Sequence, residues 1–548
     1  MEAATCRRRV VERVRTVAAR FLSSRRGHVY DRGSARILTR IRVFSHALRR
    51  LYVRKIAIGA LVGLAATFGV APSADASVPS LADLVQLKDI REHQLAFQMI
   101  ANGNGGNRAS GEPGFEKSAN YVVAKLTVAG YRPTIQRFAF PYYKELTPSV
   151  FAQTAPSPTS YTHGNDYRTL DYSGAGDVTA AAAAVDPAAA GSGSGCEADD
   201  FAGFTAGSIA LIRRGGCSFE IKADNAQKAG ASAVAFYQRP DVPDAPVEGT
   251  ALRPFTIPLI GFTNKLGVEL VQAAKAGDLK LRIRTDTISE QRTTSNIVAE
   301  TPYGNPDHVI AVGGHLDSVA AGPGINDNGS GAGTVLAIAQ KIGQIRDRVN
   351  NRVRFTFWGA EEGGDYGSKY YVASLSAEER AKIALYLNFD MIGSPNGVRG
   401  VLDGDDSLGQ GTKPPAGSDA IEKVFTDYYA GRRLALKQDA FTGSSDYQPF
   451  MDAGIPAGGV RSGTDTVKTA EEATVFGGTA GVPYDPCYHQ ACDTYDNVNA
   501  TLLDQLADGA AYATETFAKS APTMKTGSVR TPATEKTPRT GEGRTPIS

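Results

Sequence analysis

Cysteine is scarce in this sequence, with five residues in 548. No C-x-x-C pair occurs, which argues against a zinc site built from cysteine thiolates. Cys6 falls in an N-terminal segment that we expect to be removed. An even set of four remains, which in an exported chain is typical of disulfide bonds. We expect the pairs Cys196–Cys217 and Cys487–Cys492, with zinc ligation by cysteine as the alternative.

The N-terminal region lacks a hydrophobic run of membrane-spanning length. Its apolar run, 56–70, has 15 residues, whereas a helix needs about 20 to cross a bilayer. Arg54-Lys55 precedes the run and Ala74-Asp75-Ala76 follows it, which is the pattern of a secretory signal. We therefore expect a secreted protein, cleaved near Ala76 and without stable membrane association afterwards. A retained anchor is the alternative.

Most of the chain also lacks an excess of positive charge. The chain carries +2, residues 1–55 carry +13 and residues 56–76 carry −1, so residues 77–548 carry −10. A mildly acidic body gives no reason to expect nucleic-acid binding. We attribute the basic segment to a start site assigned too early, with true initiation near Val53. A cytosolic extension and a nucleic-acid-binding arm are the alternatives.

Length predicts several domains. We expect a basic extension and signal over 1–76, followed by a catalytic domain in two parts, 77–140 and 293–520. The segment between them, 141–292, is rich in short β-like pieces and reads as an insert. The tail, 521–548, has almost no apolar residues and is expected to be disordered.

Acidic and histidine side chains follow three apolar runs that read as buried strands. They are His315 and Asp317 after 309–312, Glu361 and Glu362 after 353–357, and Asp390 after 385–389. Asp327 lies in a glycine-rich loop before a predicted helix, and His489 lies between Cys487 and Cys492. In open α/β sheets, ligands bind beyond the carboxyl ends of the strands. The sequence therefore predicts one site that draws on all of these segments.

Two histidines with three carboxylates form a ligand set suited to zinc, and a shared carboxylate suits a metal pair. Asp327 is the expected bridge because its loop lies between the strand-borne ligands. We expect one ion to bind His315, Asp327 and Asp390. The other is expected to bind Asp327, Glu362 and His489.

Three further residues receive chemical roles. Asp317 can accept the hydrogen bond that a metal-bound His315 donates from its other ring nitrogen. Glu361 and Glu362 point in opposite directions on extended backbone, so Glu361 is expected to act as general base. Tyr488 can donate to the oxyanion. The alternatives are solvated loop acids for the carboxylates and a core side chain for Tyr488.

These motifs resemble the M28 peptidase family, and the chain is similar to its secreted streptomycete aminopeptidases. The matching segments are Asn104–Arg108, Gly314–Val319, Gly324–Gly331, Trp358–Glu362, Leu387–Ser394 and Cys487–His489. The insert resembles a protease-associated (PA) domain through Ile209–Phe219 and Ala226–Ala235.

The resemblance implies an α/β zinc-peptidase fold, a mixed and mostly parallel sheet flanked by helices, with a β-rich PA-like insert. It implies two zinc ions and release of N-terminal residues from peptides or proteins, with a preference for large apolar residues such as Leu. It also implies a cis peptide bond at Asp327–Asn328. We expect a monomer. A carboxypeptidase, a one-zinc glutaminyl cyclase and a non-catalytic binding protein are the alternatives.

Two positions relate differently to the family pattern. Relatives have arginine where this chain has Ser444, ahead of Ser445-Asp446, so we expect a different affinity for substrate or product. Relatives also bind calcium beside acids of the last helix. Asp504 and Asp508 match those acids, and Asp83 is the nearby acid at the position of the N-terminal partner.

Overall fold

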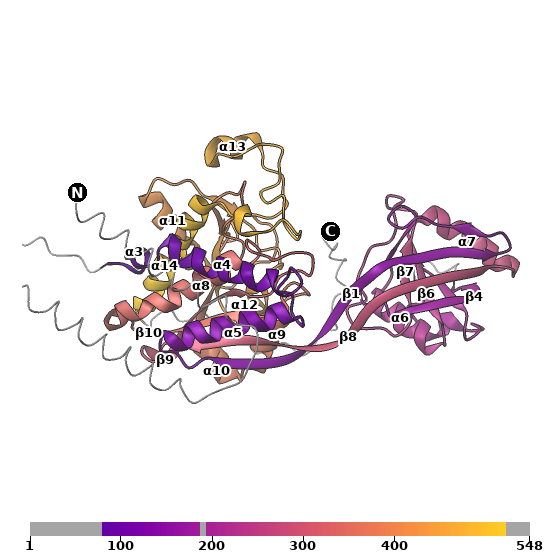
Figure 1. Ribbon diagram of the computed structural model, residues 1–548, viewed down its shortest axis with the longest axis horizontal. Coiled ribbons are helices and arrows are strands. Elements are labelled where there is room, and N and C mark those ends of the chain that lie inside the picture. The colour runs from indigo at the N-terminus through magenta and orange to yellow at the C-terminus, as the bar shows by residue number, and fades with distance from the viewer. Residues whose placement is uncertain (1–78, 187–192, 522–548) are drawn as a thin grey trace, which may run out of the picture. The chain divides into compact units, whose positions relative to one another are not determined.

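The computed structural model describes residues 79–186 and 193–521 (Figure 1). Cys6, the predicted start near Val53, the predicted signal and the predicted tail beyond Ala521 lie outside these residues. No helix within the described ranges combines the length and the apolar character that crossing a bilayer requires.

The peptidase part is built on a mixed, mostly parallel sheet with the strand order β13-β12-β14-β11-β9-β10-β8. The four central strands, β14, β11, β9 and β10, pair in parallel, whereas β8 is antiparallel to β10 and β12 is antiparallel to β14. The edge strand β13 pairs in parallel with β12. The predicted sheet type is thereby confirmed. The strand bounds are Lys280–Glu300 (β8), Asn305–His315 (β9), Asn351–Trp358 (β10), Ile383–Phe389 (β11), Gly400–Leu402 (β12), Lys437–Asp439 (β13) and Ala457–Arg461 (β14).

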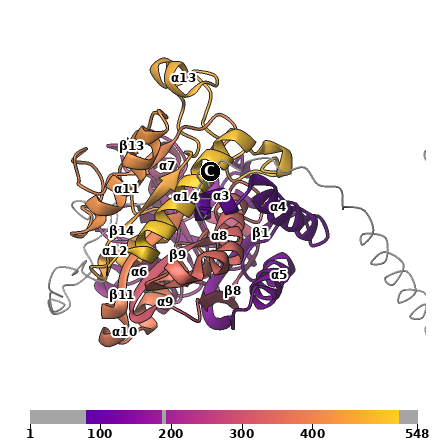
Figure 2. The ribbon, with the colours of Figure 1, turned by 90° about the vertical axis from the view of Figure 1, so that its left-hand side faces the viewer.

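Helices cover both faces because the strands alternate their apolar side chains between two cores. On β10, Phe355 and Phe357 enter one core, whereas Trp358 enters the other. The first core is covered by helices that include α8 and α14, which Figure 2 shows on the same face. These helices are α3 (Leu81–Leu84), α4 (Leu87–Asn102), α5 (Pro113–Val128), α8 (Gly329–Lys341), α11 (Ser418–Gly431) and α14 (Ala500–Lys519).

The second core is aromatic. Trp358 and Tyr386 from the sheet meet Tyr371 of α9 and Phe450 of α12, and the Tyr386 and Phe450 rings stack 4.0 Å apart. The remaining helices of this part are α9 (Tyr366–Ser374), α10 (Ala377–Lys382), α12 (Tyr447–Asp452), α13 (Ala470–Phe476), η3 (Ile342–Arg348) and η4 (Tyr495–Asn497).

The start of α8 packs tightly against the end of β11. A Cβ on Gly331 would collide with the Phe389 carbonyl, so only glycine permits this approach. Asn328 caps the helix, since its Oδ1 accepts from Gly331 N–H at 2.8 Å and its Nδ2 donates to the Phe389 carbonyl at 2.9 Å. This contact brings Asp327 beside Asp390.

The insert continues from two long strands, β1 (Thr134–Ala155) and β8, which pair antiparallel along their lengths (Figure 1). The boundaries expected at 140 and 292 therefore fall inside continuous strands. The predicted disulfide Cys196–Cys217 is present. The other elements are β2 (Thr159–Ser160), β3 (Tyr167–Thr169), β4 (Gly176–Ala184), η2 (Ala198–Phe201), β5 (Ile209–Arg213), α6 (Phe219–Lys228), β6 (Ala233–Tyr237), β7 (Leu259–Phe262) and α7 (Asn264–Ala276).

Candidate metal centre and active site

The predicted residues lie at one edge of the sheet. His315 is the last residue of β9, and Asp390 directly follows β11. Glu361 and Glu362 follow the end of β10. Because β9 pairs in parallel with both β10 and β11, their carboxyl ends meet at the same edge.

Two loops complete the set. Asp327 lies directly before the capping residue of α8, and the Asp327–Asn328 peptide bond is cis, as predicted. His489 comes from a loop closed by the Cys487–Cys492 disulfide, which confirms the second predicted pair. The structure thus brings all five predicted ligands to one place.

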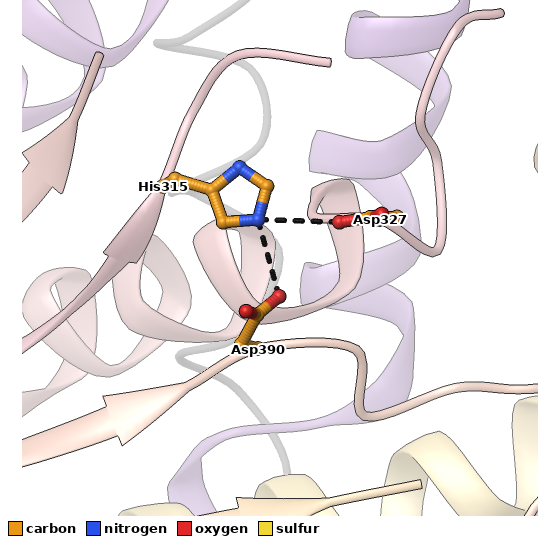
Figure 3. A group of neighbouring side chains, drawn as sticks. All are labelled: His315, Asp327 and Asp390. Carbon is orange, nitrogen blue, oxygen red and sulfur yellow. Dashed lines mark hydrogen bonds and ion pairs between the residues drawn. The ribbon is translucent and has the colours of Figure 1, made fainter. Parts of the chain in front are cut away.

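A first group consists of His315, Asp327 and Asp390 (Figure 3). Nε2 of His315 lies 3.2 Å from Oδ1 of Asp327 and 3.1 Å from Oδ1 of Asp390. The His315 side chain is only 1% exposed. One nitrogen and two carboxylate oxygens therefore surround a point at which an ion can bind.

A second group consists of Asp327, Glu362 and His489. Nε2 of His489 lies 3.3 Å from Oδ2 of Asp327 and 3.0 Å from Oε2 of Glu362. Asp327 therefore turns one oxygen to His315 and the other to His489. This arrangement matches what a carboxylate bridging two ions requires.

The charges of the two groups favour a cation. Burial, together with the neighbouring Asp327 carboxylate, raises the pKa of Glu362 to about 7. Burial opposes protonation of His489, but the carboxylates of Glu362 and Asp327 outweigh it and raise the pKa of His489 to about 11. In the metal-free protein, protons on the histidines thus offset the negative charge. A divalent cation between the same atoms would replace them.

The donor atoms fit zinc. Each group offers one imidazole nitrogen and two carboxylate oxygens, which are ligand types that zinc accepts. Oε1 of Glu362 is buried and has no hydrogen-bond partner among the described residues. A buried carboxylate oxygen of this kind is unfavourable unless an ion or another donor reaches it.

Glu361 stands apart from both groups. Its Oε2 lies 3.9 Å from Nε2 of His315, whereas Glu362 contacts His489. Burial raises the pKa of Glu361 well above its usual value; the charge of His315 opposes this shift, and the carboxylates of Asp365 and Asp390 add to it. A carboxyl group with a raised pKa suits proton transfer near neutral pH.

Asp317 and Tyr488 also lie at the site. Nδ1 of His315 is 3.2 Å from the Asp317 carbonyl oxygen and 3.7 Å from the Asp317 carboxylate. The Asp317 carboxylate instead accepts from the Glu361 N–H at 3.3 Å.

The Tyr488 ring stacks on His489 with centroids 3.8 Å apart. Burial and the carboxylates of the site raise the pKa of the Tyr488 phenol, so it remains a donor.

Three supporting residues were not predicted. Arg108 is fully buried and donates to the carbonyl oxygens of three residues in the segment 316–324. Ser445 donates to Oδ2 of Asp390 at 2.7 Å. Asp493 accepts from the backbone N–H of Asp327 at 2.9 Å. Arg108 belongs to a matching motif and Asp493 follows a disulfide cysteine, but neither pattern indicates which distant loop the side chain holds.

Other acidic groups are arranged differently. Asp403, Asp405 and Glu422 lie close together, but carboxylates of all three accept hydrogen bonds from nearby backbone N–H groups. Asp504 and Asp508 do not belong to any metal-compatible group in the described part of the chain. Asp83 accepts from Ser80 at the start of α3, and calcium binding there remains a prediction.

Comparison with known proteins places this geometry in a family. Residues 296–514 match the model of peptidase family M28, and residues 178–270 match the PA domain. The chain is 42% identical over 437 residues to an aminopeptidase of Pseudomonas aeruginosa (strain UCBPP-PA14), covering 78% of this chain and 80% of that protein.

Two further comparisons agree with the match to an aminopeptidase. The chain is 40% identical over 418 residues to a probable leucine aminopeptidase 2 of Aspergillus fumigatus, covering 76% of this chain and 80% of that protein. Among solved structures, an aminopeptidase from Aneurinibacillus sp. strain AM-1 aligns with a TM-score of 0.60 at 26% identity, covering 79% of this chain and 94% of that chain. The chain therefore belongs to peptidase family M28, with a PA domain inserted ahead of the M28 region, which confirms the predicted zinc-aminopeptidase family.

Proposed function

We propose that this protein is a secreted two-zinc aminopeptidase that releases N-terminal residues from peptides. The observation that carries the proposal is the position of Asp327, whose two carboxylate oxygens face His315 and His489 separately. We assign one zinc ion to His315, Asp327 and Asp390, and the other to Asp327, Glu362 and His489. Zinc at these positions supplies Lewis-acid polarisation of the substrate carbonyl and a lowered pKa of water.

Glu361 is the proposed general base. Its carboxylate lies beside the two groups without belonging to either, and 11% of the side chain is exposed. It can therefore reach a water molecule or a substrate atom from the open side. Glu361 takes a proton from the attacking water and passes it to the leaving amine. Asp317 holds the backbone N–H of Glu361 and so orients this segment.

Tyr488 is the proposed donor to the oxyanion. The stacking on His489 fixes the ring beside a proposed ligand, and the raised pKa keeps the phenol protonated. A donor held where charge develops stabilises the transition state more than the ground state. The α-amine of the substrate is proposed to bind Glu361 and Asp390, whose side chains are 11% and 18% exposed.

Several finer features belong to the same proposal. The two disulfides fit an oxidising extracellular compartment. The name of the Aspergillus relative supports a preference for Leu or similar residues. Calcium near Asp504 and Asp508 is proposed from the family resemblance, and the nearby Asp83 carboxylate accepts from the Ser80 N–H at the start of α3.

A carboxypeptidase would require an accessible cation for the α-carboxylate of its substrate. Arg108 lies beneath the site, but it is fully buried and its donors point at backbone carbonyls. The geometry therefore favours recognition of an amine over recognition of a carboxylate.

Hydrolysis of Leu-p-nitroanilide and of its N-acetylated form tests the proposal directly. We expect cleavage of only the free-amine substrate, loss of activity with a chelator and recovery on adding zinc. Two equivalents of zinc should restore full activity. Equal cleavage of the acetylated substrate, or activity that survives complete zinc removal, would contradict the proposal.

A further inference from the structure

Asp493 holds the backbone that carries Asp327. It is only 2% exposed. Oδ1 of Asp493 accepts from the N–H of Asn326 at 2.8 Å, and Oδ2 accepts from the N–H of Asp327 at 2.9 Å. Its own carbonyl accepts from the N–H of Ile325 at 3.1 Å. One residue thus receives three consecutive backbone N–H groups.

These contacts fix the position of the Asp327 side chain. A carboxylate facing two histidines must be held in both translation and rotation, because each oxygen has a different partner. The opposite end of the same segment is held by Arg108, which donates to the Gly324 carbonyl. The segment 324–327 is therefore fixed from two sides, and Asp493 fixes the side nearer the carboxylate.

The same residue is tied to His489. The Cys487–Cys492 disulfide closes a loop that contains His489, and Asp493 is the next residue after that loop. The Asp493 N–H also donates to the Gln490 carbonyl at 3.1 Å. Asp493 therefore links the histidine loop to the Asp327 segment, and this link sets the separation between Asp327 and His489.

Only a carboxylate completes this contact. Both oxygens of Asp493 accept from backbone donors, whereas asparagine offers one acceptor oxygen and one NH2 donor. Asparagine has the same shape but would direct a donor at one of the two N–H groups. Each of the two backbone N–H groups needs an acceptor at this buried position, so packing alone does not account for aspartate here.

We propose that Asp493 is a positioning residue for the metal centre, which holds Asp327 and His489 in the mutual geometry that zinc binding requires. This inference rests on the proposed function, since it assigns zinc to those two residues. Residues that orient metal ligands through hydrogen bonds typically change metal affinity about 10- to 100-fold when they are replaced.

The test is the zinc affinity of Asp493→Asn in the full chain, measured by competition with a chromogenic chelator. We expect about 10- to 100-fold weaker binding, together with an altered visible absorption spectrum of the cobalt-substituted protein. Asp496→Asn is the baseline control, because Asp496 lies nearby and is exposed. An affinity within twofold of the wild type would overturn the proposal.

A second variant separates positioning from general packing. Asp485 is 1% exposed and accepts from the side-chain Nδ2 of Asn326 at 2.7 Å and from the N–H of Cys487 at 2.9 Å. In the described part of the chain it makes no hydrogen bond with the Asp327 backbone. We expect Asp485→Asn to lower the thermal midpoint while zinc affinity stays within about threefold of the wild type, well below the loss for an orienting residue. Equal losses of affinity in the two variants would reduce Asp493 to a packing role.

Hydrogen exchange provides a test that needs no folded variant. In the metal-free wild type, we expect slow exchange of the Asn326 and Asp327 amides, because both donate to the buried carboxylate. Exchange as fast as in an exposed loop would refute the contact. If the wild-type protein binds zinc tightly but does not cleave Leu-p-nitroanilide, the proposed function is wrong. The zinc-affinity test of Asp493 would still apply in that case.

Discussion

The hydroxyl of Ser445 donates to Oδ2 of Asp390 at 2.7 Å, while Oδ1 of the same carboxylate lies 3.1 Å from His315. The Ser445 hydroxyl in turn accepts from Nδ2 of Asn388 at 2.9 Å. A serine from one loop thus determines which oxygen of Asp390 faces His315. One residue earlier, where the family resemblance leads us to expect arginine, this chain has Ser444, whose hydroxyl contacts the Thr442 hydroxyl at 2.7 Å.

Replacement of Ser445 should weaken metal binding. Ser445→Ala frees Oδ2 of Asp390, so the carboxylate can rotate away from His315. We expect a loss of zinc affinity of about tenfold, measured by chelator competition. Ser118→Ala is the matched control, because Ser118 is a buried serine on α5 that donates to a backbone carbonyl at 2.9 Å. Unchanged affinity in Ser445→Ala would show that the hydrogen bond does not orient Asp390.

Replacement of Glu361 should separate catalysis from metal binding. Glu361→Gln removes the proposed base while keeping the shape of the side chain, and both metal groups stay intact. We expect kcat to fall about 10²- to 10⁴-fold, with two zinc ions still bound per chain by elemental analysis. Glu378→Gln, at an 82% exposed glutamate, is the control. A near-normal kcat in Glu361→Gln would refute the assignment.

Removal of the Tyr488 hydroxyl should lower kcat more than it changes KM. Tyr488→Phe keeps the ring stacked on His489 but deletes the donor proposed for the oxyanion. Loss of one such donor typically costs about 10²- to 10³-fold in kcat. Tyr370→Phe, at a tyrosine that is 42% exposed, is the control. If KM rises while kcat is unchanged, Tyr488 contributes to substrate binding and does not stabilise the transition state.

His93 should make stability depend on pH. It is 2% exposed, lies between the Tyr121 hydroxyl and Oε1 of Gln340, and burial lowers its pKa from 6.5 to about 4. The unfolded chain therefore takes up a proton at a higher pH than the folded protein. The contribution to stability is present above pH 6.5 and is lost as pH falls towards 4.

The loss should amount to about 3 kcal/mol of unfolding free energy. Urea titration of the metal-free protein at pH 7.5 and pH 4.5 measures this difference, and chelation separates it from loss of zinc. His93→Gln should show a weaker decline than the wild type over the same interval. An identical decline in both proteins would mean that His93 does not contribute to the pH dependence.

Residues that sequence reasoning placed correctly share a local signature. His315 and Asp390 stand at the ends of short strands whose continuous apolar runs are visible without knowing the fold. Asp327 stands in a glycine-rich loop, and Gly331 at its end permits close packing against Phe389. Adjacent parallel strands then bring these positions together, and that pairing follows from the fold class.

Residues that sequence reasoning missed depend on contacts between distant loops. Asp493 reaches the backbone of Asp327, 166 positions earlier, and Arg108 reaches carbonyls more than 200 positions away. No local pattern specifies such partners. The strand β1 also continues to Ala155, beyond the domain boundary predicted at 140. Its pairing with β8 supplies the backbone hydrogen bonds that extend the strand.

The single carboxylate of Asp327 faces both histidines, so two ions held in the two proposed groups would not behave independently. An ion on the His315 side would draw electron density from this carboxylate and restrict its rotation, and both effects would change the affinity of the His489 side. Stepwise loading, in which the first equivalent changes the affinity for the second, follows from this sharing. Mixed-metal forms should therefore differ from the average of the two uniform ones.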